Sequence, residues 1–411
     1  MKIKRALIVT VGTGTRPGVH IVKPLVKTIR DSRPDFIVLV VTEKSLLFGE
    51  DIVKELGLDK SSYVYEPLKD FDDFQSVFRR INHAFHKLHD MGFSHEEIQI
   101  DFTSGTKAMS SGAVLSAIYN QCASIKYITG QRKNGVVLDG TEKFLTVCPS
   151  AVFALHDIQL SQELILGLRF DTANEILGKI QIDLLSEEEK RWVRNLRLIS
   201  QAYSAWDKFD HKSANKKMSK ITWEPSFLQP FKPSRSAESL LSNLAGDKKN
   251  SELLLLDLSN NAIRRGKEGK YDDAVARFYR ITELFAQQLL ERSPYHINTS
   301  DVDLSKIPEL RDLLGKFKNE VDGKIRIGLE MDYNVLNELG HPLGEKFLAD
   351  KQLRGRLSER NESILAHGLK PISNSLYRKL YQSLLILFES EYPDFTVKAQ
   401  RVQFPWVKNK V

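Results

Sequence analysis

The stretch IQIDFTSGTKAM, residues 98–109, decides the fold of the first part of this chain. Its first five residues alternate with apolar side chains as in a strand, and the small apolar residues after Lys107 favour a helix. The turn between them consists of hydroxyl residues and one glycine. Such a turn presents backbone N–H groups and hydroxyls to an anion, and Lys107 adds a full positive charge. The stretch therefore predicts an α/β domain with an anion site at a helix N-terminus.

The residues before this stretch repeat the strand-to-helix pattern. Continuous apolar runs at 6–11 and 36–41 predict two buried parallel strands, each closed by polar residues. Residues 20–30 between the two runs have the apolar spacing of an amphipathic helix. A helix that connects two parallel strands forms a βαβ unit, so we expect a mostly parallel sheet in the first 150 residues.

A tight turn is expected to end this sheet. Asn134-Gly135 lies between two β-branched runs, 125–129 and 136–138, and both turn positions tolerate the positive φ of an antiparallel hairpin. Ligands of such sheets bind at the carboxyl ends of the strands. We therefore expect four residues to gather at one edge: Thr13, Thr42, Thr103 and Gly130.

The glycine and hydroxyl residues of this edge do not complete a nucleotide fingerprint. Residues 103–107 lack the glycine spacing of a Walker loop, and residues 12–14 do not complete the dinucleotide motif, so the sequence does not favour ATP or NAD. A helix capped by its own Thr or Ser side chain gives the same pattern without any ligand. The polar residues Gln131 and Arg132, close to the expected edge, favour the ligand interpretation.

The second half of the chain has a helical pattern. Residues 151–250 predict a helical connector, and residues 251–411 predict an all-α domain. Two apolar stripes mark helix faces that would pack in its core: Ala274, Phe278, Ile281, Phe285 and Leu289 in one, and Leu376, Leu380, Leu384 and Leu387 in the other.

Near the C-terminus, residues 358–368 read SERNESILAHG. Arg360 and His367 are nearly two helical turns apart, so we expect both on one helix face. Ser358 would cap the start of this helix and Gly368 its end, where the helix dipole favours a protonated histidine. RNA is cut without a metal when its own 2′-OH attacks the adjacent phosphate, which needs a proton carrier and a cation. Spacing alone fits equally a surface arginine near a capping histidine.

Both motifs resemble those of a known family. A strand that ends in GTGT, residues 12–15, and the later TSGTKAM turn, residues 103–109, are similar to the CARF domain of CRISPR-associated effectors. The Arg-Asn-x5-His spacing resembles the R-x(4–6)-H signature of HEPN ribonucleases, and residues 261–279 resemble a stretch of CARF–HEPN effectors. The chain is thus similar to the Csm6/Csx1-like CARF–HEPN ribonucleases of type III CRISPR systems.

The resemblance implies a metal-independent endoribonuclease of antiviral defence that cuts single-stranded RNA when a cyclic oligoadenylate binds. Residues 1–150 would form a Rossmann-like CARF domain, paired in a homodimer that binds one ring of cyclic tetra- or hexa-adenylate across the two-fold axis. Together with the expected sheet edge, the resemblance gives these candidate ligand contacts: Thr13, Gly14, Thr42, Thr103, Ser104, Gly105, Thr106, Lys107, Gln131 and Arg132.

For residues 251–411 the resemblance implies a composite cleft between two HEPN domains. His367 would act on protons at the 2′-OH and the leaving 5′-oxygen, Arg360 would stabilise the developing charge, and Asn361 would orient the phosphate or the histidine. The products would have 2′,3′-cyclic phosphate and 5′-hydroxyl ends. Two alternatives stay open: a cyclic-oligoadenylate-binding regulator without nuclease activity, and a CARF domain that also cleaves its ligand. The sequence gives neither the ring size nor the RNA preference.

Composition sets the remaining expectations. Two cysteines among 411 residues predict no disulfide framework and suit a reducing cytoplasm. No apolar window reaches the ~20 residues of a membrane span, and Gly12 interrupts the apolar start, so we expect neither export nor membrane insertion. No matched ligand set predicts a metal, and we expect no cofactor. Most of the net charge of +7 lies in residues 186–250, which have 13 basic and 8 acidic side chains, and their lysines predict a solvated face more often than an RNA contact.

Overall fold

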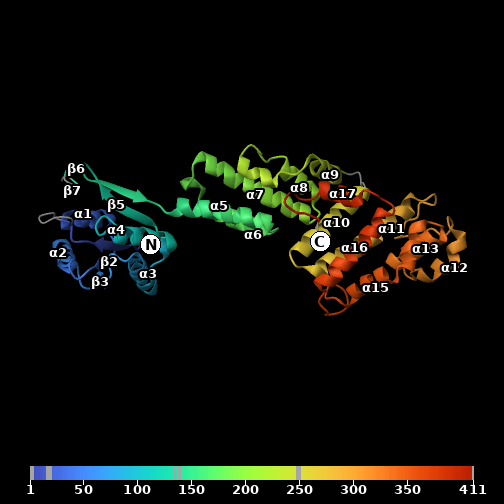
Figure 1. The fold of residues 1–411 in the computed structure, drawn as a ribbon, viewed down its shortest axis with the longest axis horizontal. Helices are drawn as coiled ribbons and strands as arrows, with labels where there is room; N and C mark the ends of the chain where they lie inside the picture. The colour runs from blue at the N-terminus through green and yellow to red at the C-terminus, as the bar shows by residue number, and fades with distance from the viewer. Residues whose placement is uncertain (1–3, 15–20, 134–135, 138–139, 247–250, 410–411) are drawn as a thin grey trace. The chain divides into compact units, whose positions relative to one another are not determined.

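The computed structural model describes residues 4–14, 21–133, 136–137, 140–246 and 251–409. The chain divides into two compact units: residues 1–157 with 180–190, and residues 158–179 with 191–411. The first unit contains a sheet covered by helices, and the second consists of helices (Figure 1). This confirms the predicted fold class, α/β followed by all-α. Among the described residues, no helix combines the length and apolar character needed to span a bilayer.

Strands and helices alternate through most of the first unit. In chain order its elements are β1 (Ala6–Val11), α1 (Val22–Ser32), β2 (Phe36–Val41), α2 (Leu46–Leu56), β3 (Tyr63–Pro67), α3 (Phe74–Asp90), η1 (His95–Glu97), β4 (Ile98–Asp101), α4 (Lys107–Tyr119), β5 (Ser124–Thr129), β6 (Arg132–Lys133), β7 (Val136–Val137) and β8 (Lys143–Val147). Helix α5 (Ser150–Leu166) continues from the first unit into the second, and η2 (Ile182–Leu184) belongs to the first.

The main sheet of the described residues has the strand order β3-β2-β1-β4-β5-β8. In this order, each strand from β3 through β2, β1 and β4 to β5 pairs in parallel with the next. Strand β1 lies at the centre, where Ala6 pairs with both Phe36 and Ile98. After β3 the chain returns across the sheet to form β4 on the other side of β1. The loops after β1 and β4 therefore meet at the point where the strand order reverses, which is where sheets of this type bind ligands.

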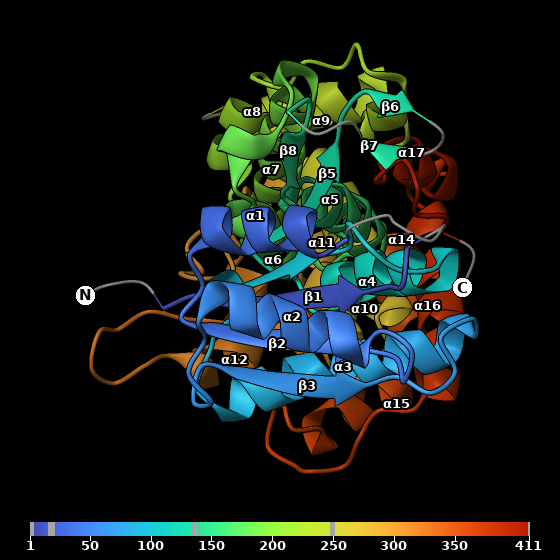
Figure 2. The ribbon, with the colours of Figure 1, turned by 90° about the vertical axis from the view of Figure 1, so that its left-hand side faces the viewer.

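Alternating strand residues bury both faces of this sheet. On one face, Leu7, Val9 and Leu39 pack against α1 and α2, and on the other, Ile8 and Ile100 pack against α3 and α4 (Figure 2). Side chains of successive strand residues point to opposite faces, so a strand buried on both sides has an unbroken apolar sequence. The runs at 6–11 and 36–41 are such strands, as predicted.

The antiparallel end of the sheet differs from the prediction in its partner strand. Strand β5 pairs with β8, with Ile125 opposite Val147, and not with residues 136–138. Strands β6 and β7 form a separate two-stranded sheet. The predicted turn residues Asn134-Gly135 lie outside the described residues. The side chains of β8 are all exposed, although its sequence KFLTV contains the apolar and β-branched residues typical of a strand.

The second unit is built from helices. Its elements are α6 (Phe170–Lys179), α7 (Glu187–Asp207), α8 (His211–Met218), η3 (Ser226–Phe231), α9 (Arg235–Ala245), α10 (Ser251–Lys267), α11 (Tyr271–Arg292), η4 (Pro308–Leu310), α12 (Arg311–Leu314), η5 (Gly315–Phe317), α13 (Leu329–Glu338), α14 (Pro342–Ala349), α15 (Lys351–Glu359), η6 (Arg360–Glu362), α16 (Asn374–Glu389) and α17 (Phe395–Arg401).

Helix α11 lies at the centre of this unit, in contact with α10, α13 and α16 (Figure 1). Both predicted apolar stripes, on α11 and α16, are buried. Phe278 on α11 stacks on Tyr377 and Tyr381 of α16, with ring centroids 5.6 and 5.7 Å apart. The two faces thus pack against each other, as their helical spacing predicts.

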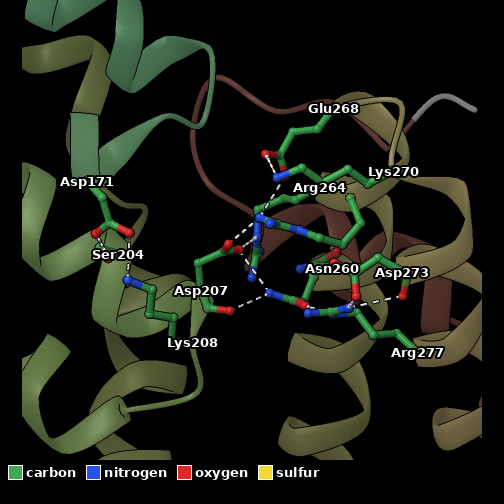
Figure 3. Close-up of polar contacts among 12 residues, drawn as sticks. Asp171, Ser204, Asp207, Lys208, Asn260, Arg264, Glu268, Lys270, Asp273 and Arg277 are labelled. Carbon is green, nitrogen blue, oxygen red and sulfur yellow. Dashed lines mark hydrogen bonds and ion pairs between the residues drawn. The ribbon is translucent and has the colours of Figure 1, made fainter. Parts of the chain in front are cut away.

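Polar contacts join helix α7 to α10 and α11 (Figure 3). Asp207, the last residue of α7, accepts hydrogen bonds from Asn261 and from Arg264 Nε, the latter at 2.7 Å, and pairs with Arg265. Arg277 on α11 donates to Asn261 in turn. Because Arg264 is fully buried, removing its carboxylate partner costs about 3–5 kcal/mol. These polar residues of the 261–279 stretch therefore hold the connector on the helical domain.

Candidate functional site

In the first unit, the loops after β1 and β4 meet at the predicted sheet edge. The Gly12 amide donates to the Ser104 hydroxyl at 3.1 Å, and the Thr10 hydroxyl donates to the Ser104 carbonyl at 2.5 Å. A Cβ on Gly12 would lie 2.7 Å from the Gly105 backbone, which is closer than any side chain allows. Gly105 has a φ of 132°, a conformation that favours glycine. The two glycines let the loops touch.

Hydroxyl groups of the turn have partners inside the protein. The Thr103 hydroxyl oxygen accepts the Ile128 amide at 3.1 Å and so ties the turn to β5. Thr106 caps α4: its oxygen accepts the Met109 amide at 3.2 Å, and its hydroxyl donates to the Phe71 carbonyl at 2.8 Å. An N-cap of this kind contributes about 1 kcal/mol. These bonds fix the shape of the turn before any ligand binds.

Several of the predicted ligand contacts are exposed around this turn. Lys107 is the first residue of α4, its side chain is exposed, and in the described part of the chain its ammonium has no carboxylate partner. Thr13, Gly14 and Gln131 are exposed as well. A cation at the positive end of a helix attracts an anion together with the free N–H groups of that helix.

Two other candidates lie in different surroundings. Thr42 is buried, and its hydroxyl donates to the Ser45 hydroxyl at 3.1 Å, so it closes the turn between β2 and α2. Arg132 begins β6, and its side chain lies outside the described part of the structure. Ligand contacts by the ten candidate residues stay predictions.

The buried carboxylate of Asp101 stabilises the turn at residues 102–106 by accepting a hydrogen bond from its backbone. Asp101, the last residue of β4, is fully buried, and its Oδ1 accepts the Thr103 amide at 2.7 Å. Burial raises the pKa of Asp101, although the hydrogen bonds from Thr103 counteract this. Its Oδ2 has no hydrogen-bond partner among the described residues. Nothing in the sequence marks Asp101, because one acidic residue at a strand end gives no signal of burial.

In the second unit, the Arg360–His367 motif does not lie on one helix. Helix α15 ends at Glu359, a single 3-10 turn follows at 360–362, and residues 363–367 form turns. The predicted continuous helix is therefore wrong. Ser363 adopts an extended backbone, with ψ 162°, which ends the helical hydrogen bonding four residues before the histidine.

The predicted ends of this helix are wrong for the same reason. Asp350, and not Ser358, caps α15, since its carboxylate accepts the Leu353 amide at 2.8 Å. Ser358 lies in the last turn of α15. His367 lies beyond the helix, so the dipole argument for its protonation does not apply.

Backbone hydrogen bonds fold the motif into a compact loop. The His367 amide donates to the Asn361 carbonyl at 3.2 Å, and the Lys370 amide donates to the Glu362 carbonyl at 2.9 Å. A Cβ on Gly368 would lie 2.0 Å from that Glu362 oxygen. Gly368 is therefore required for a close approach of two backbone segments, not as a helix cap. The loop returns the His367 backbone to the 3-10 turn η6, which begins with Arg360.

The loop brings the His367 backbone to that of Asn361, the residue after Arg360 in the chain. Asn361 and His367 are exposed, and Arg360 Nη1 lies 3.5 Å from Asn361 Oδ1. The guanidinium of Arg360 lies over the ring of Tyr279, with Cζ 5.0 Å from the ring centroid. Within the described ranges, no carboxylate pairs with Arg360. Glutamates pair with two other arginines of this unit: Arg280 with Glu283 at 2.7 Å, and Arg354 with Glu330 at 2.8 Å.

The side chains that bind metals in proteins do not gather at this loop. In the ranges that the structure describes, no group of three or more His, Cys, Asp or Glu side chains is arranged to hold a metal ion. The loop offers an arginine that has no carboxylate partner among the described residues, the amide of Asn361 and the exposed imidazole of His367.

The chain is similar to known proteins both in part of its sequence and in its fold. Residues 244–390 match the family model of the Csm6 HEPN domain. The fold is similar to that of Enterococcus italicus Csm6 bound to cyclic hexa-2′-fluoro-hexa-dAMP, with a TM-score of 0.56 and 13% identity over 98% of this chain and 99% of that chain. Can2 from Sulfobacillus thermosulfidooxidans in complex with cyclic tetra-adenylate matches with a TM-score of 0.26 and 12% identity, over 52% and 69%. No curated protein matches the chain by sequence.

A mostly parallel sheet followed by a helical region that matches a HEPN model is the arrangement that the resemblance to CARF–HEPN proteins implies. The resemblance found in the sequence is thus confirmed. The fold of the chain is similar to that of Csm6, and its residues 244–390 match the Csm6 HEPN domain.

Proposed function

We propose that this protein is a CRISPR ribonuclease that a cyclic oligoadenylate activates, with the ring bound by the first unit and single-stranded RNA cut by the second. One observation carries the nuclease proposal. Arg360 has no carboxylate partner in the described part of the chain, and the loop that follows it bonds the His367 amide to the Asn361 carbonyl while leaving the His367 side chain exposed. An uncompensated guanidinium next to an imidazole suits a phosphodiester, which needs a cation and a proton carrier at the same phosphate.

The proposed reaction needs no group beyond these side chains and the RNA. His367 takes the proton of the 2′-OH while the 2′-oxygen forms a bond to phosphorus, and the bond from phosphorus to the 5′-oxygen breaks. A proton returns to the leaving 5′-oxygen, so the products carry 2′,3′-cyclic phosphate and 5′-hydroxyl ends. Arg360 stabilises the charge on the phosphoryl oxygens, and Asn361 orients the phosphate. No metal or other cofactor takes part in this scheme.

The sensor part of the proposal depends on the turn at the sheet edge. Exposed Lys107 begins α4, and the touching loops of Gly12 and Gly105 hold backbone amides at the same edge. Enterococcus italicus Csm6, which has this fold, was solved with a cyclic hexanucleotide analogue. We propose that the turn binds a phosphate or adenosine of the ring. Tighter binding to the cleaving arrangement than to the resting one would activate the enzyme.

We further propose a homodimer as the active form. The loop that carries the motif exposes apolar side chains beside His367, with Ile364 67% and Leu369 87% exposed. An exposed apolar cluster next to a proposed active site favours a protein interface. A second copy of the same loop would cover these side chains and would place two Arg360–His367 pairs in one cleft.

The deciding experiment mixes labelled RNA with linear and cyclic oligoadenylates of several sizes, with EDTA present in every reaction. One ring should stimulate cleavage strongly in the wild type. His367→Ala should bind that ring normally and lose at least about 10³-fold in rate, because both the proton transfer and its geometry are lost. Lys107→Ala should lose ring affinity and keep the slow cleavage seen without ligand.

Matched variants and products separate the alternatives. His296→Ala and Lys60→Ala, which remove exposed residues of the same types elsewhere, should behave as wild type. Unchanged cleavage by His367→Ala would refute the nuclease site, and ring binding without any cleavage would favour the regulator. Equal rates with and without every ring would refute the sensor. Loss of the intact ring on chromatography would show that the first unit cleaves its ligand.

A further inference from the structure

The ring of Tyr279 contacts the guanidinium of Arg360, the candidate catalytic arginine. Tyr279 lies on α11, which packs against the 3-10 turn η6 that begins with Arg360. Arg360 Cζ lies 5.0 Å from the centroid of the Tyr279 ring, within the range of a cation–π interaction. Tyr279 is the last residue of the 261–279 stretch, and the sequence analysis gave it no role.

The ring of Tyr279 contacts the guanidinium of Arg360 without neutralising its charge. A carboxylate partner would occupy the N–H donors of Arg360 and neutralise its charge, as Glu330 does for Arg354. The negative face of an aromatic ring attracts the guanidinium and leaves its N–H edges free for two oxygens of a phosphate. The Nε of Arg360 is buried and has no hydrogen-bond partner in the described residues. In these ranges, the ring of Tyr279 and the distant Oδ1 of Asn361 are the groups that hold the guanidinium.

The hydroxyl of Tyr279 does not explain its position. Across the described residues, this hydroxyl makes no hydrogen bond. Burial raises the pKa of Tyr279, and the nearby carboxylates of Glu283, Asp332 and Glu330 raise it further against the opposing effect of Arg360. The phenol therefore stays protonated near neutral pH and is unsuited to be a proton acceptor. What Tyr279 supplies is the face of its ring.

We infer that Tyr279 is a positioning residue of the nuclease site, whose ring face orients Arg360 toward the scissile phosphate while leaving its charge intact. This inference depends on the proposed function, because it acts only through Arg360. Fixing a flexible arginine in the geometry of the transition state raises kcat more than it lowers KM, since the contact matters most when charge develops on the phosphate.

The test compares side chains that keep or remove the ring. Tyr279→Phe should keep kcat within about twofold, because the ring face is retained. Tyr279→Leu should lower kcat by about tenfold with little change in KM, the size expected for a partly buried cation–π contact. Tyr271→Leu removes a ring of the same helix that packs on Tyr377, away from Arg360, and should cleave as wild type.

A second measurement keeps the shape of the side chain constant and so does not depend on the folding of the leucine variant. Phenylalanine analogues with increasing numbers of ring fluorines at position 279 should lower kcat stepwise, because each fluorine weakens the negative ring face. In an Arg360→Ala background, the leucine substitution should have no further effect. A flat fluorine series, or wild-type kcat for Tyr279→Leu, with inactive Arg360→Ala would overturn the positioning role alone. Wild-type cleavage by Arg360→Ala would instead overturn the proposed function.

Discussion

The turn at residues 102–106 and the loop at residues 363–370 are held in opposite ways. In the turn, side chains do the holding: the hydroxyls of Ser104 and Thr106 bond to the backbone of neighbouring segments. In the loop, the backbone holds itself, as the bond from the His367 amide to the Asn361 carbonyl shows. The polar side chains of the turn are therefore occupied by hydrogen bonds within the protein. The loop is held by its backbone, so the side chains of Asn361 and His367 stay exposed.

A sequence motif thus identifies where a site lies more readily than it identifies which of its side chains are free to contact a ligand. The hydroxyl residues of the turn mark the place of a site, but several of them act as structural partners, so exposed Lys107 is the stronger candidate for contact with a ligand. The motif of the loop names the reactive side chains directly, and its structural residue is Gly368. Substitution of Gly12 should disturb the turn alone, and substitution of Gly368 should disturb the loop alone.

The largest effect is expected for Gly368→Ala. The added Cβ would lie 2.0 Å from the Glu362 carbonyl oxygen, so the loop must open and His367 must move from Arg360. We expect cleavage to fall by about 100-fold or more, because misplacement by about 1 Å costs that much in catalysis. Single-turnover cleavage measures this, with ring binding unchanged.

Gly355→Ala is the matched control for this loop substitution. A Cβ at Gly355, in the middle of α15, meets no atom within 4 Å, so alanine should fit and raise stability by up to about 1 kcal/mol. Cleavage by Gly368→Ala at the wild-type rate would show that the loop geometry is not needed for activity.

A smaller effect, confined to the first unit, is expected for Gly12→Ala. Its Cβ would lie 2.7 Å from the Gly105 backbone and would separate the loops after β1 and β4. Affinity for the cyclic ligand should fall by about tenfold or more, since the preformed amides of the turn lose their alignment. Calorimetric titration with the activating ring measures this. The ligand-free cleavage rate should stay at the wild-type value, and a parallel loss of that rate would contradict the separation of the two sites.

A further effect concerns stability alone and distinguishes the buried carboxylates Asp332 and Asp101. Asp332 on α13 is fully buried, and neither of its oxygens has a hydrogen-bond partner in the described ranges, unlike Asp101 under the turn. Burial, with repulsion from Glu283, raises the pKa of Asp332 to about 7. The folded protein therefore holds this proton more tightly than the unfolded chain does, so this group makes stability fall as pH rises from about 4 to about 7.

Asp332→Asn should remove that fall. At pH 8 the variant should exceed the wild type in free energy of unfolding by about 1–4 kcal/mol, and the difference should shrink towards pH 4. Denaturant unfolding at several pH values measures both curves. Asp312→Asn, which changes an exposed aspartate of the same unit, should follow the wild type. Parallel curves for Asp332→Asn and the wild type would show that the carboxyl ionises normally.

The fold class, a sheet with helices followed by a helical region, follows from patterns in the sequence. Unbroken apolar runs at 6–11 and 36–41 can be buried only as strands covered on both faces, and the stripe that includes Phe278 and Phe285 fits only a helix. These patterns are local, because they follow from the repeat of one element. The choice of Arg360 and His367 as candidates came from the resemblance of their spacing to the HEPN signature.

Only the tertiary structure decided how the motif residues are held. The helix that the spacing predicts ends early, because residues 363–370 gain their hydrogen bonds from backbone groups of η6 and its neighbours rather than from a further helical turn. Strand β8 pairs with β5 although its own side chains are exposed, and Tyr279 meets Arg360 from 81 positions earlier in the chain. Contacts between distant segments depend on the packing of whole elements, and no local repeat in the sequence records them.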